Sequence, residues 1–371
     1  MKKMYPDYNN CLVNLSNSIL KYYGIKNNHS TLTELDELLE KEYKNVIVIL
    51  YDGFGSNLLA EKLGETAFLS KHKIKDITSV FPATTTAATT ALITAATPAE
   101  HCWLGWDVYV KSINKTVTLY LNVEKGKQEQ LSETGVAKRE FPYISIFDKI
   151  NESGNAKAYC VSPYDGGIFY NIERPEEMYN KLSELCSTDE KKFIYAYCYE
   201  PDNTMHIHGT EDTRIIELMK TIDKKTEEFC GKLSDTLVII TADHGHMTVG
   251  NYIVLADYPA IQSMLVRETS LEHRATNFFV KEGLQEKFKA EFMRLFGNDF
   301  ILMSRQEIFE SEIFGDGTPH EKFESCIGDF IAIAISDKAF IDEYDSEPLK
   351  GAHAGITEDE VKIPLIVVNR D

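Results

Sequence analysis

Apolar runs of strand length recur along the chain, and amphipathic stretches of helix length lie between several of them. The strongest run, Asn45–Tyr51, is apolar on both faces and rich in β-branched residues. A strand that is buried on both sides is typical of a parallel sheet covered by helices. Similar runs lie at residues 156–161, 193–197, 236–241, 330–335 and 363–368. The alternation predicts an α/β fold with a doubly wound, mostly parallel sheet covered by helices on both faces.

The same pattern suggests how the chain is divided. Apolar positions recur about every 3.6 residues in 11–23 and 33–39, so we expect residues 1–44 to form a helical segment packed on the core. About 120 residues separate the strand ending at Thr241 from the last strand, and they hold a short strand at 277–280 and a helix at 284–296. We expect residues 256–344 to form a smaller inserted α/β cap. Residues 45–255 and 345–371 then form the core.

Composition narrows the range of partners. The chain has 371 residues, with 39 Lys and Arg against 58 Asp and Glu, which gives a formal net charge of −19. Such an acidic surface repels polyanions and anionic lipids, so we expect neither a nucleic-acid polymer nor a membrane as partner. The 43% hydrophobic and 26% charged residues are typical of a folded globular protein. The sequence does not indicate an oligomeric state.

Cysteine usage and the absence of a long apolar run predict a cytoplasmic location. The seven cysteines are scattered without a Cys-x-x-Cys motif, and an odd number cannot all pair within one chain. Reduced thiols in a cytoplasmic protein are the simplest interpretation. Polar residues from Pro6 to Asn17 interrupt any signal-peptide core, and no run approaches the roughly 18 apolar residues that span a bilayer.

Carboxylate and imidazole side chains follow several of the predicted strands, where a doubly wound sheet builds its site. They are Asp52 after the first strand, Asp202 and His206 after residues 193–197, Asp243 and His244 after residues 236–241, and His353 before the last strand. Taken alone, each could serve only as a turn or capping residue. Converging carboxylates repel one another, however, so a shared cation is the simplest explanation. Three Asp and three His suit two divalent ions, with Zn²⁺ preferred and Mn²⁺ as the main rival.

A threonine-rich segment supplies a candidate nucleophile. Residues 79–94 place Pro82 and then Thr84, Thr85 and Thr86 before an Ala-rich stretch with helical character. A hydroxyl at a helix N-terminus lies beside backbone N–H groups that favour a bound phosphate. The alternative is a simple threonine N-cap on a close-packed helix.

Together, these motifs resemble the alkaline phosphatase superfamily, in its branch of nucleotide pyrophosphatases and type I phosphodiesterases. The motifs are Leu50–Gly53, Phe81–Thr86 with Pro98–His101, Glu200–Asp202 with His206, Thr241–Gly245, and Gly351–His353. They follow the order found in that family and run from residue 50 to residue 353. Each is weak alone, but the ordered set is highly specific.

The resemblance implies a role for each site residue. One metal is held by Asp202, His206 and His353, and the second by Asp52, Asp243, His244 and the oxygen of the nucleophile. The nucleophile in this superfamily lies ten positions before the second residue of a Thr-Gly pair; here the pair is Thr94-Ala95, which selects Thr85. His101 and His246 are near these motifs and are expected at most to orient ligands.

The sequence departs from the family pattern at several places. Ala95 stands in place of the usual Gly, and Cys102 also occupies a common Gly position; both are expected to change only the packing. Neither Trp106 nor Asp107 is the Asn that contacts phosphate in the nucleotide pyrophosphatase branch, which weakens the expectation of nucleotide specificity. A Cys-x-Pro-x-Arg element, which a sulfatase needs for its modified nucleophile, is absent from the sequence, so we do not expect sulfate esters as substrates.

The resulting hypothesis is a metal-dependent phosphoric ester hydrolase that acts on a small phosphate ester, of the phosphodiesterase or nucleotide pyrophosphatase type. Two metals assist Thr85, which attacks phosphorus and forms a covalent phosphothreonine intermediate without a separate general base. The cap is expected to close over the substrate. Alternatives on the same metal site are a phosphomonoesterase, a phosphonate hydrolase or a phosphosugar mutase. A more remote alternative is a metal-bound protein that binds without catalysis.

Overall fold

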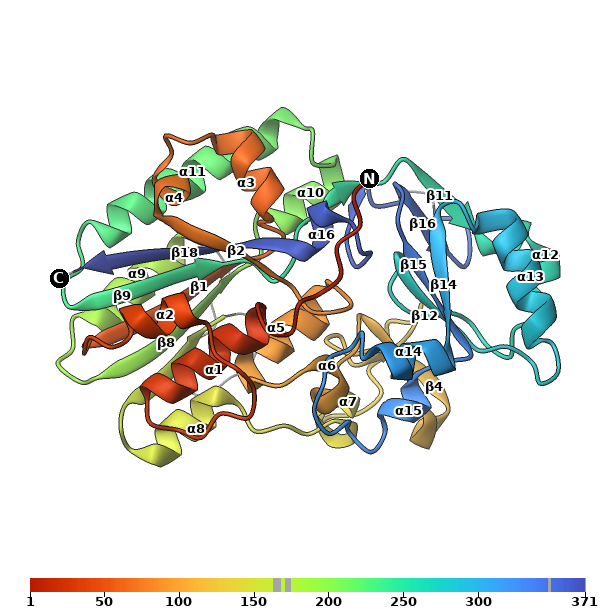
Figure 1. Ribbon diagram of the computed structural model, residues 1–371, viewed down its shortest axis with the longest axis horizontal. Coiled ribbons are helices and arrows are strands. Elements are labelled where there is room, and N and C mark those ends of the chain that lie inside the picture. The colour runs from red at the N-terminus through yellow and green to blue at the C-terminus, as the bar shows by residue number, and fades with distance from the viewer. Residues whose placement is uncertain (163–167, 171–174, 346–347, 371) are drawn as a thin grey trace.

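The computed structural model describes residues 1–162, 168–170, 175–345 and 348–370, and two seven-stranded sheets dominate these residues. The first sheet lies at the left of Figure 1 and the second at the right. The first has the order β2-β18-β9-β1-β8-β6-β7. Its strands are β1 (Asn45–Tyr51), β2 (Lys73–Thr78), β6 (Lys157–Val161), β7 (Ile168–Tyr170), β8 (Lys192–Cys198), β9 (Thr236–Thr241) and β18 (Lys362–Arg370).

Parallel pairing prevails in the first sheet, which confirms the predicted fold class. The central strand β1 is parallel to both β8 and β9, and β6 is parallel to both β7 and β8. The last strand, β18, is antiparallel to β9 and β2. All seven residues of β1 are buried, as its apolar run predicted.

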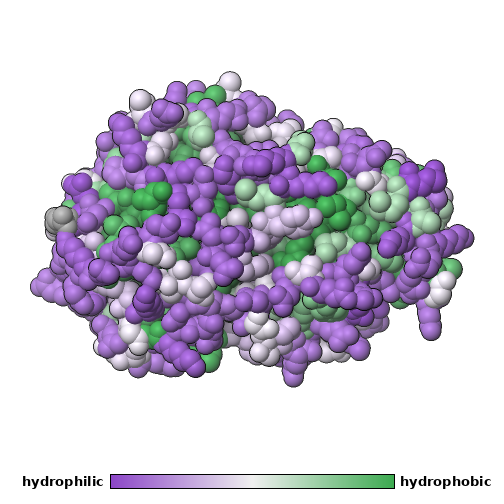
Figure 2. Space-filling model, in the orientation of Figure 1, coloured by the Kyte–Doolittle hydropathy of each residue, from purple (hydrophilic) through white to green (hydrophobic). Residues whose placement is uncertain are grey.

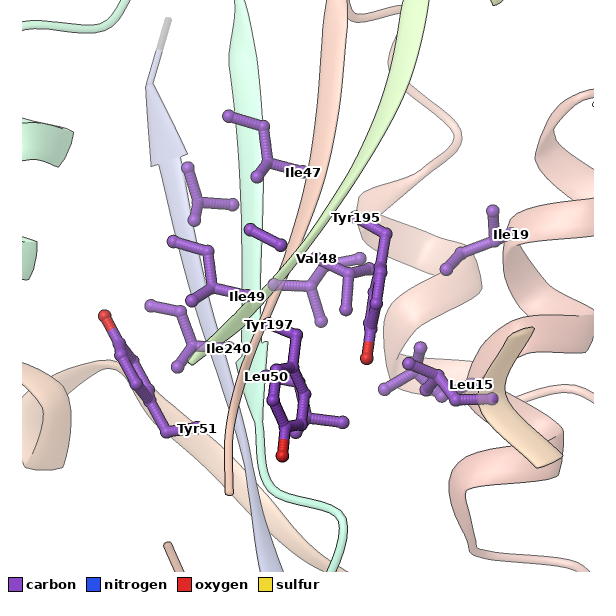
Figure 3. Close-up of a cluster of buried hydrophobic side chains, with 14 of the residues drawn as sticks. Leu15, Ile19, Ile47, Val48, Ile49, Leu50, Tyr51, Tyr195, Tyr197 and Ile240 are labelled. Carbon is purple, nitrogen blue, oxygen red and sulfur yellow. The ribbon is translucent and has the colours of Figure 1, made fainter. Parts of the chain in front are cut away.

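Helices cover both faces of this sheet (Figure 1). On one face lie α1 (Leu12–Tyr22), α2 (Thr33–Leu38), α5 (Thr85–Thr94) and α8 (Ile146–Ser153); on the other lie α3 (Ser56–Leu63), α4 (Phe68–His72), α9 (Pro175–Cys186) and α11 (Thr213–Cys230). Side chains alternate along β1, so that Val48 and Leu50 point toward Leu15 of α1 while Tyr51 points the other way (Figure 3). The hydroxyl of Tyr51 lies 2.8 Å from that of Thr226 in α11.

The second sheet has the order β14-β15-β13-β12-β3-β4-β5 and consists of antiparallel pairs. Its strands are β3 (Asp107–Val110), β4 (Lys115–Thr118), β5 (Val123–Glu124), β12 (Ser270–Leu271), β13 (Ala275–Phe278), β14 (Phe300–Ser304) and β15 (Phe330–Ala334). The helices α7 (Val136–Glu140), α12 (Pro259–Gln262), α13 (Gln285–Phe296), α14 (Arg305–Ser311) and α15 (Phe323–Cys326) also lie in this part of the chain.

This sheet corrects two expectations. The run at 330–335 forms β15, which pairs antiparallel with β13 and β14 and does not join the parallel sheet. Residues 107–124, which were expected in the core, provide three strands of the second sheet. These strands are only two to four residues long, and β3 and β4 are joined by a tight turn at Asn114, so they produce no long apolar run. The borders of the cap therefore stay a prediction.

Two small ladders form separate two-stranded sheets. β10 (Met247–Thr248) pairs antiparallel with β17 (Gly351–Ala352), and β11 (Asn251–Val254) pairs parallel with β16 (Lys338–Ile341) at the right of Figure 1. Three short helices lie near the middle of the same view: α6 (Pro98–His101), α10 (Asp202–His208) and α16 (Glu358–Val361). The β10–β17 ladder brings the segment after β9 next to His353.

The molecular surface is largely hydrophilic, and the cysteines are unpaired, as the composition suggested. Hydrophilic side chains cover most of the face shown in Figure 2. All seven cysteines are free thiols. Within the described ranges, no helix combines the length and the apolar character needed to cross a membrane.

Candidate active site

The predicted site residues meet at the carboxyl edge of the first sheet. Asp52 follows β1, Asp202 begins α10 shortly after β8, and Asp243 follows β9. Parallel neighbours end at the same edge, so three separate segments deliver their carboxylates to one place. Two sets of side chains each bring their possible donor atoms within 4.8 Å of one another. One set is Asp202, His206 and His353, and the other is Asp52, Asp202 and His244.

The first set is organised around Asp202. One helical turn separates Asp202 from His206, and His206 Nε2 lies 3.2 Å from Asp202 Oδ2. His206 Nδ1 donates to the Gly351 carbonyl at 2.8 Å, and His353 Nδ1 donates to the Ala83 carbonyl at 3.0 Å. These backbone contacts fix both rings with Nε2 on the side of Asp202, which is how metal-ligating histidines are commonly oriented.

The second set surrounds His244. His244 Nε2 lies 3.3 Å from Asp52 Oδ1 and 3.6 Å from Asp243 Oδ2. The other oxygen of Asp243 accepts from the backbone N–H groups of Gly53 and His244, at 3.1 and 3.0 Å. Tyr197, from β8, donates to Asp52 Oδ2. Sequence analysis did not indicate this contact, because Tyr197 belongs to an apolar run and its hydroxyl meets Asp52 only once the strands are paired.

Thr85 lies at the start of α5, beside the second set. Its Oγ1 is 3.4 Å from Asp52 Oδ2 and 3.2 Å from His244 Nε2. Neither neighbouring hydroxyl has a described hydrogen bond to the donor sets. Thr84 donates to Glu272 at 2.6 Å, and the Thr86 hydroxyl is buried with no hydrogen-bond partner among the described residues. The geometry therefore favours Thr85 over both neighbours as the nucleophile.

The surrounding protein groups do not fully compensate the negative charge of the buried carboxylates. Asp52 Oδ1, Asp202 Oδ1 and Asp243 Oδ2 are buried and have no hydrogen-bond partner among the described residues. Burial and the neighbouring Asp243 raise the pKa of Asp52 well above its usual value, and burial also raises the pKa of Asp243. Burial opposes the ionisation of Asp202, but His206 and His246 hold its pKa well below the usual range. Orphaned carboxylate oxygens beside imidazole nitrogens fit divalent cations.

A cavity of about 580 Å³ opens over this set, and both sheets line it. The first sheet contributes Tyr197, Tyr199 and Asn203 beside the carboxylates and imidazoles. The second contributes Trp106, Asp107, Leu271, Glu272 and His273. The lining residues that the structure describes include neither Lys nor Arg.

Glu272 is the unexpected member of the cavity wall. Its Oε1 accepts from the Thr84 hydroxyl at 2.6 Å and from the Trp106 backbone N–H at 2.7 Å. Burial raises the pKa of Glu272 to about 7. The residue stands in a short loop between β12 and β13 that carries no motif, so sequence reasoning missed it.

His101 lies apart from the donor sets in its described contacts. Its Nδ1 accepts from the Trp103 backbone N–H at 3.0 Å, and burial lowers the pKa of His101 to about 3. These contacts organise the loop after α6, and none joins His101 to the residues of the two sets.

Comparison with known proteins agrees with this geometry. The family model described as type I phosphodiesterase / nucleotide pyrophosphatase matches residues 46–355. No curated protein matches the chain by sequence.

Solved structures with the same fold share little sequence with this chain. Human ectonucleotide pyrophosphatase/phosphodiesterase 5 has 17% identity, a TM-score of 0.68, and 87% coverage of each chain. The murine protein has 19% identity, a TM-score of 0.66, and coverage of 86% of this chain and 87% of that one. An inactive threonine-to-alanine variant of the murine protein has been solved in complex with AMP. Phosphonoacetate hydrolase from Sinorhizobium meliloti 1021, in complex with phosphonoformate, has 14% identity, a TM-score of 0.64, and coverage of 88% of this chain and 90% of that one.

Proposed function

This chain belongs to the type I phosphodiesterase/nucleotide pyrophosphatase family, a family of hydrolases, and we propose that it hydrolyses small phosphodiesters with Thr85 as the nucleophile. One observation carries the proposal: the Thr85 hydroxyl lies at a helix N-terminus, 3.2 Å from His244 and 3.4 Å from Asp52. Both neighbours belong to the candidate donor sets.

The two donor sets divide the work of binding cations. Asp202, His206 and His353 would hold one divalent ion. Asp52 and His244 of the second set would hold another beside Thr85, together with Asp243, whose Oδ2 lies 3.6 Å from His244 Nε2. Mixed carboxylate and imidazole donors suit Zn²⁺ best, with Mn²⁺ as the alternative. When bound, the ions supply positive charge that lowers the pKa of a nearby hydroxyl and neutralises phosphoryl oxygens.

Thr85 carries the covalent chemistry. Its Oγ1 loses its proton and attacks phosphorus, a new P–O bond forms, and the bond to the leaving oxygen breaks; that oxygen takes up a proton and departs as the alcohol. The product is a covalent phosphothreonine that keeps the other ester group, and water then releases it and restores the Thr85 hydroxyl. The backbone N–H groups at the start of α5 and the dipole of this ten-residue helix stabilise the phosphoryl oxygens during both steps.

The cavity wall favours a phosphodiester over a phosphomonoester. A monoester dianion carries one more negative charge, and the described lining offers no Lys or Arg to receive it. Glu272 and Asp107 add carboxyl groups to the same wall. Trp106 and Tyr199 also line the cavity, and their rings can cover an apolar or aromatic ester group. The AMP complex of the inactive murine variant supports both a threonine nucleophile and an organic phosphate ligand.

A matched substrate pair tests the proposal. The purified protein, loaded with Zn²⁺ or Mn²⁺, is assayed with bis(4-nitrophenyl) phosphate and with 4-nitrophenyl phosphate, which release the same chromophore. We expect kcat/KM for the diester to be higher by at least about a hundredfold, equivalent to about 2.7 kcal/mol. Chelation should remove both activities. A preference for the monoester would reject the diesterase, and an unchanged rate after chelation would reject the metal mechanism.

A further inference from the structure

Two cysteines that are far apart in the sequence lie in contact beside the second sheet. Cys102 directly follows α6, and Cys326 is the last residue of α15. Their Sγ atoms are 3.8 Å apart, although 224 positions separate them in the chain. Both side chains are buried in one apolar cluster with residues of β3, β4 and β15. Neither belongs to the donor sets or to the wall of the active-site cavity, so the proposed function gives this pair no role.

The backbone holds the two thiols in place. Cys102 has a φ of 62°, in the left-handed region that favours glycine, and its N–H donates to the Pro98 carbonyl at 2.9 Å. The carbonyl of Cys326 accepts from the buried side-chain amide of Asn277 at 3.0 Å. In a disulfide the sulfur atoms are about 2.05 Å apart. They therefore have to approach by about 1.8 Å, a distance that rotation about the two Cα–Cβ bonds can cover.

A separate cavity of about 250 Å³ leads to Cys326. Cys326 lines it together with Lys322 and Glu140, whose side chains form an ion pair at 2.9 Å. The Lys322 side chain is 36% exposed, so the cavity opens to solvent. Its volume is several times the roughly 30 Å³ that a water molecule occupies in the liquid, which is enough for hydrogen peroxide.

Cys102 lies behind Cys326 as seen from this cavity. It is not among the lining residues, and burial raises the pKa of its thiol well above the usual value. Because the thiolate is the reactive form of cysteine, burial makes Cys102 a poor first target for an oxidant. A reagent that enters the cavity therefore meets Cys326 first.

We propose that Cys326 and Cys102 form a redox pair, which hydrogen peroxide entering this cavity oxidises to a disulfide. The Cys326 thiol gives up its proton and its sulfur attacks one peroxide oxygen; the O–O bond breaks, and the departing hydroxide takes up that proton as water. The product is a sulfenic acid at Cys326. The sulfur of Cys102 then attacks that of Cys326, the S–O bond breaks, and the hydroxide leaves as water with the Cys102 proton. Two thiols and one peroxide thus yield one disulfide and two water molecules.

The disulfide would tie the end of α6 to the end of α15. A cross-link between positions so distant in the chain restricts the unfolded state and thereby stabilises the folded one. We therefore expect the oxidised protein to unfold at a temperature several degrees higher than the reduced protein. This role goes beyond the proposed function and does not depend on the metal sites.

Oxidation of the intact protein tests the pair without an activity assay. Reduced protein, freed of reductant, is exposed to hydrogen peroxide, its remaining thiols are blocked with N-ethylmaleimide, and its tryptic peptides are analysed by mass spectrometry without reduction. Trypsin leaves each cysteine as the only one in its peptide, residues 76–111 and 323–338. We expect these two peptides to be linked, with a mass lower by two hydrogen atoms than their sum. Dithiothreitol should reverse the link and the higher unfolding temperature.

Single variants establish the order of the two steps. In Cys102→Ser the sulfenic acid of Cys326 has no thiol to attack it, so dimedone, which reacts with sulfenic acids, should label Cys326. In Cys326→Ser we expect Cys102 to remain an unlabelled thiol. The matched control is Cys186→Ser, which removes a partly buried cysteine outside the pair and should form the same disulfide as wild type.

Three results would overturn the inference. One is folded wild type that forms no link between Cys102 and Cys326 under peroxide. Another is a link that forms only when the protein is unfolded in urea, since the folded contact would then not be its cause. Dimedone labelling of Cys102 in Cys326→Ser would overturn the entry of the oxidant through the cavity at Cys326.

Discussion

The two sheets contribute different parts of one cavity. The first sheet brings the candidate donors and Thr85 from segments at its carboxyl edge. The second sheet contributes only wall residues, among them Trp106 and Glu272. The comparison indicates that the type of reaction and the choice of substrate reside on separate parts of the fold. Changes on the first sheet should then abolish turnover, whereas changes on the second should alter which ester is preferred.

The two parts are joined by a buried ion pair. Arg274 precedes β13 of the second sheet, and Glu360 lies in α16 just before β18 of the first. Arg274 donates from Nε and Nη2 to the two oxygens of Glu360, at 2.6 and 2.8 Å, and neither side chain is exposed. Glu360 also accepts from the Gly355 N–H, which follows the His353 segment. This ion pair therefore helps to fix the cavity wall of the second sheet in place relative to the donor residues of the first sheet.

The largest expected effect is the loss of turnover in Thr85→Ala. Without the hydroxyl no covalent intermediate can form, so we expect kcat to fall by at least about a thousandfold. Zn²⁺ binding should persist, since Asp52, Asp243 and His244 remain. Metal content and diester kinetics on the same sample provide the measurement. Appreciable turnover by the metal-loaded variant would assign the nucleophile elsewhere.

A second prediction concerns the connection between the sheets. Arg274→Met removes one partner of the buried pair and leaves the Glu360 charge uncompensated, so we expect a loss of about 3–5 kcal/mol in the free energy of unfolding. Urea unfolding followed by circular dichroism measures it.

The control for this experiment is the double variant Arg274→Met with Glu360→Gln. It removes both charges and should recover part of the lost stability. A single Arg274→Met variant as stable as wild type would show that the pair does not hold the sheets together.

How well the fold could be predicted depended on strand length. The run at 45–51 coincides with β1, and the run at 236–241 with β9, because long strands buried on both faces are marked by apolar residues throughout. β2 was missed, since Lys73–Thr78 forms an edge strand in which only the last two residues are buried and which carries charged residues. β3, β4 and β5 were missed because strands this short pair through the backbone and have no recognisable side-chain pattern.

The site residues also differ in how well the sequence could predict them. Asp52 and Asp243 could be proposed because they directly follow strong strands, and the structure brings both next to His244. Their roles as ligands stay predictions. Tyr197 and Glu272 could not be found, because their importance comes from partners far away in the sequence, Asp52 and Thr84. The position of His246 likewise depends on a long-range contact, the β10–β17 ladder.

A third, smaller effect concerns the crowding of charge on the first sheet. Burial raises the pKa of Asp243, so its charge is unfavourable when no cation is present. Asp243→Asn keeps an oxygen to accept from Gly53 and His244 and removes the charge. We expect the metal-free variant to be more stable than the metal-free wild type by about 1–2 kcal/mol, and its Zn²⁺ affinity to be lower. Thermal unfolding with and without a chelator measures both effects. A lower stability in the chelator would contradict the electrostatic explanation.

The smallest expected effect is on the second sheet and concerns substrate preference. Burial raises the pKa of Glu272 to about 7, so its carboxyl is neutral below that pH and negatively charged above it. Bound cations lower the pH at which it ionises. An ionised Glu272 repels an anionic diester, so KM for 4-nitrophenyl propyl phosphate should increase several-fold as pH rises through this pKa. For 4-nitrophenyl 2-aminoethyl phosphate, whose ammonium group offsets the phosphate charge, KM should stay level or fall.

Glu272→Gln distinguishes the wall from the catalytic machinery in this experiment. Glutamine keeps an oxygen for the Thr84 hydroxyl and the Trp106 N–H and cannot ionise. Both substrates should then show the same pH dependence of KM, while kcat at saturating substrate should stay close to that of wild type, because Thr85 and the donor sets are unchanged. If the two substrates still diverge with pH in Glu272→Gln, another group sets the preference. If kcat falls as far as in Thr85→Ala, Glu272 takes part in the chemistry and the division of labour between the sheets is wrong.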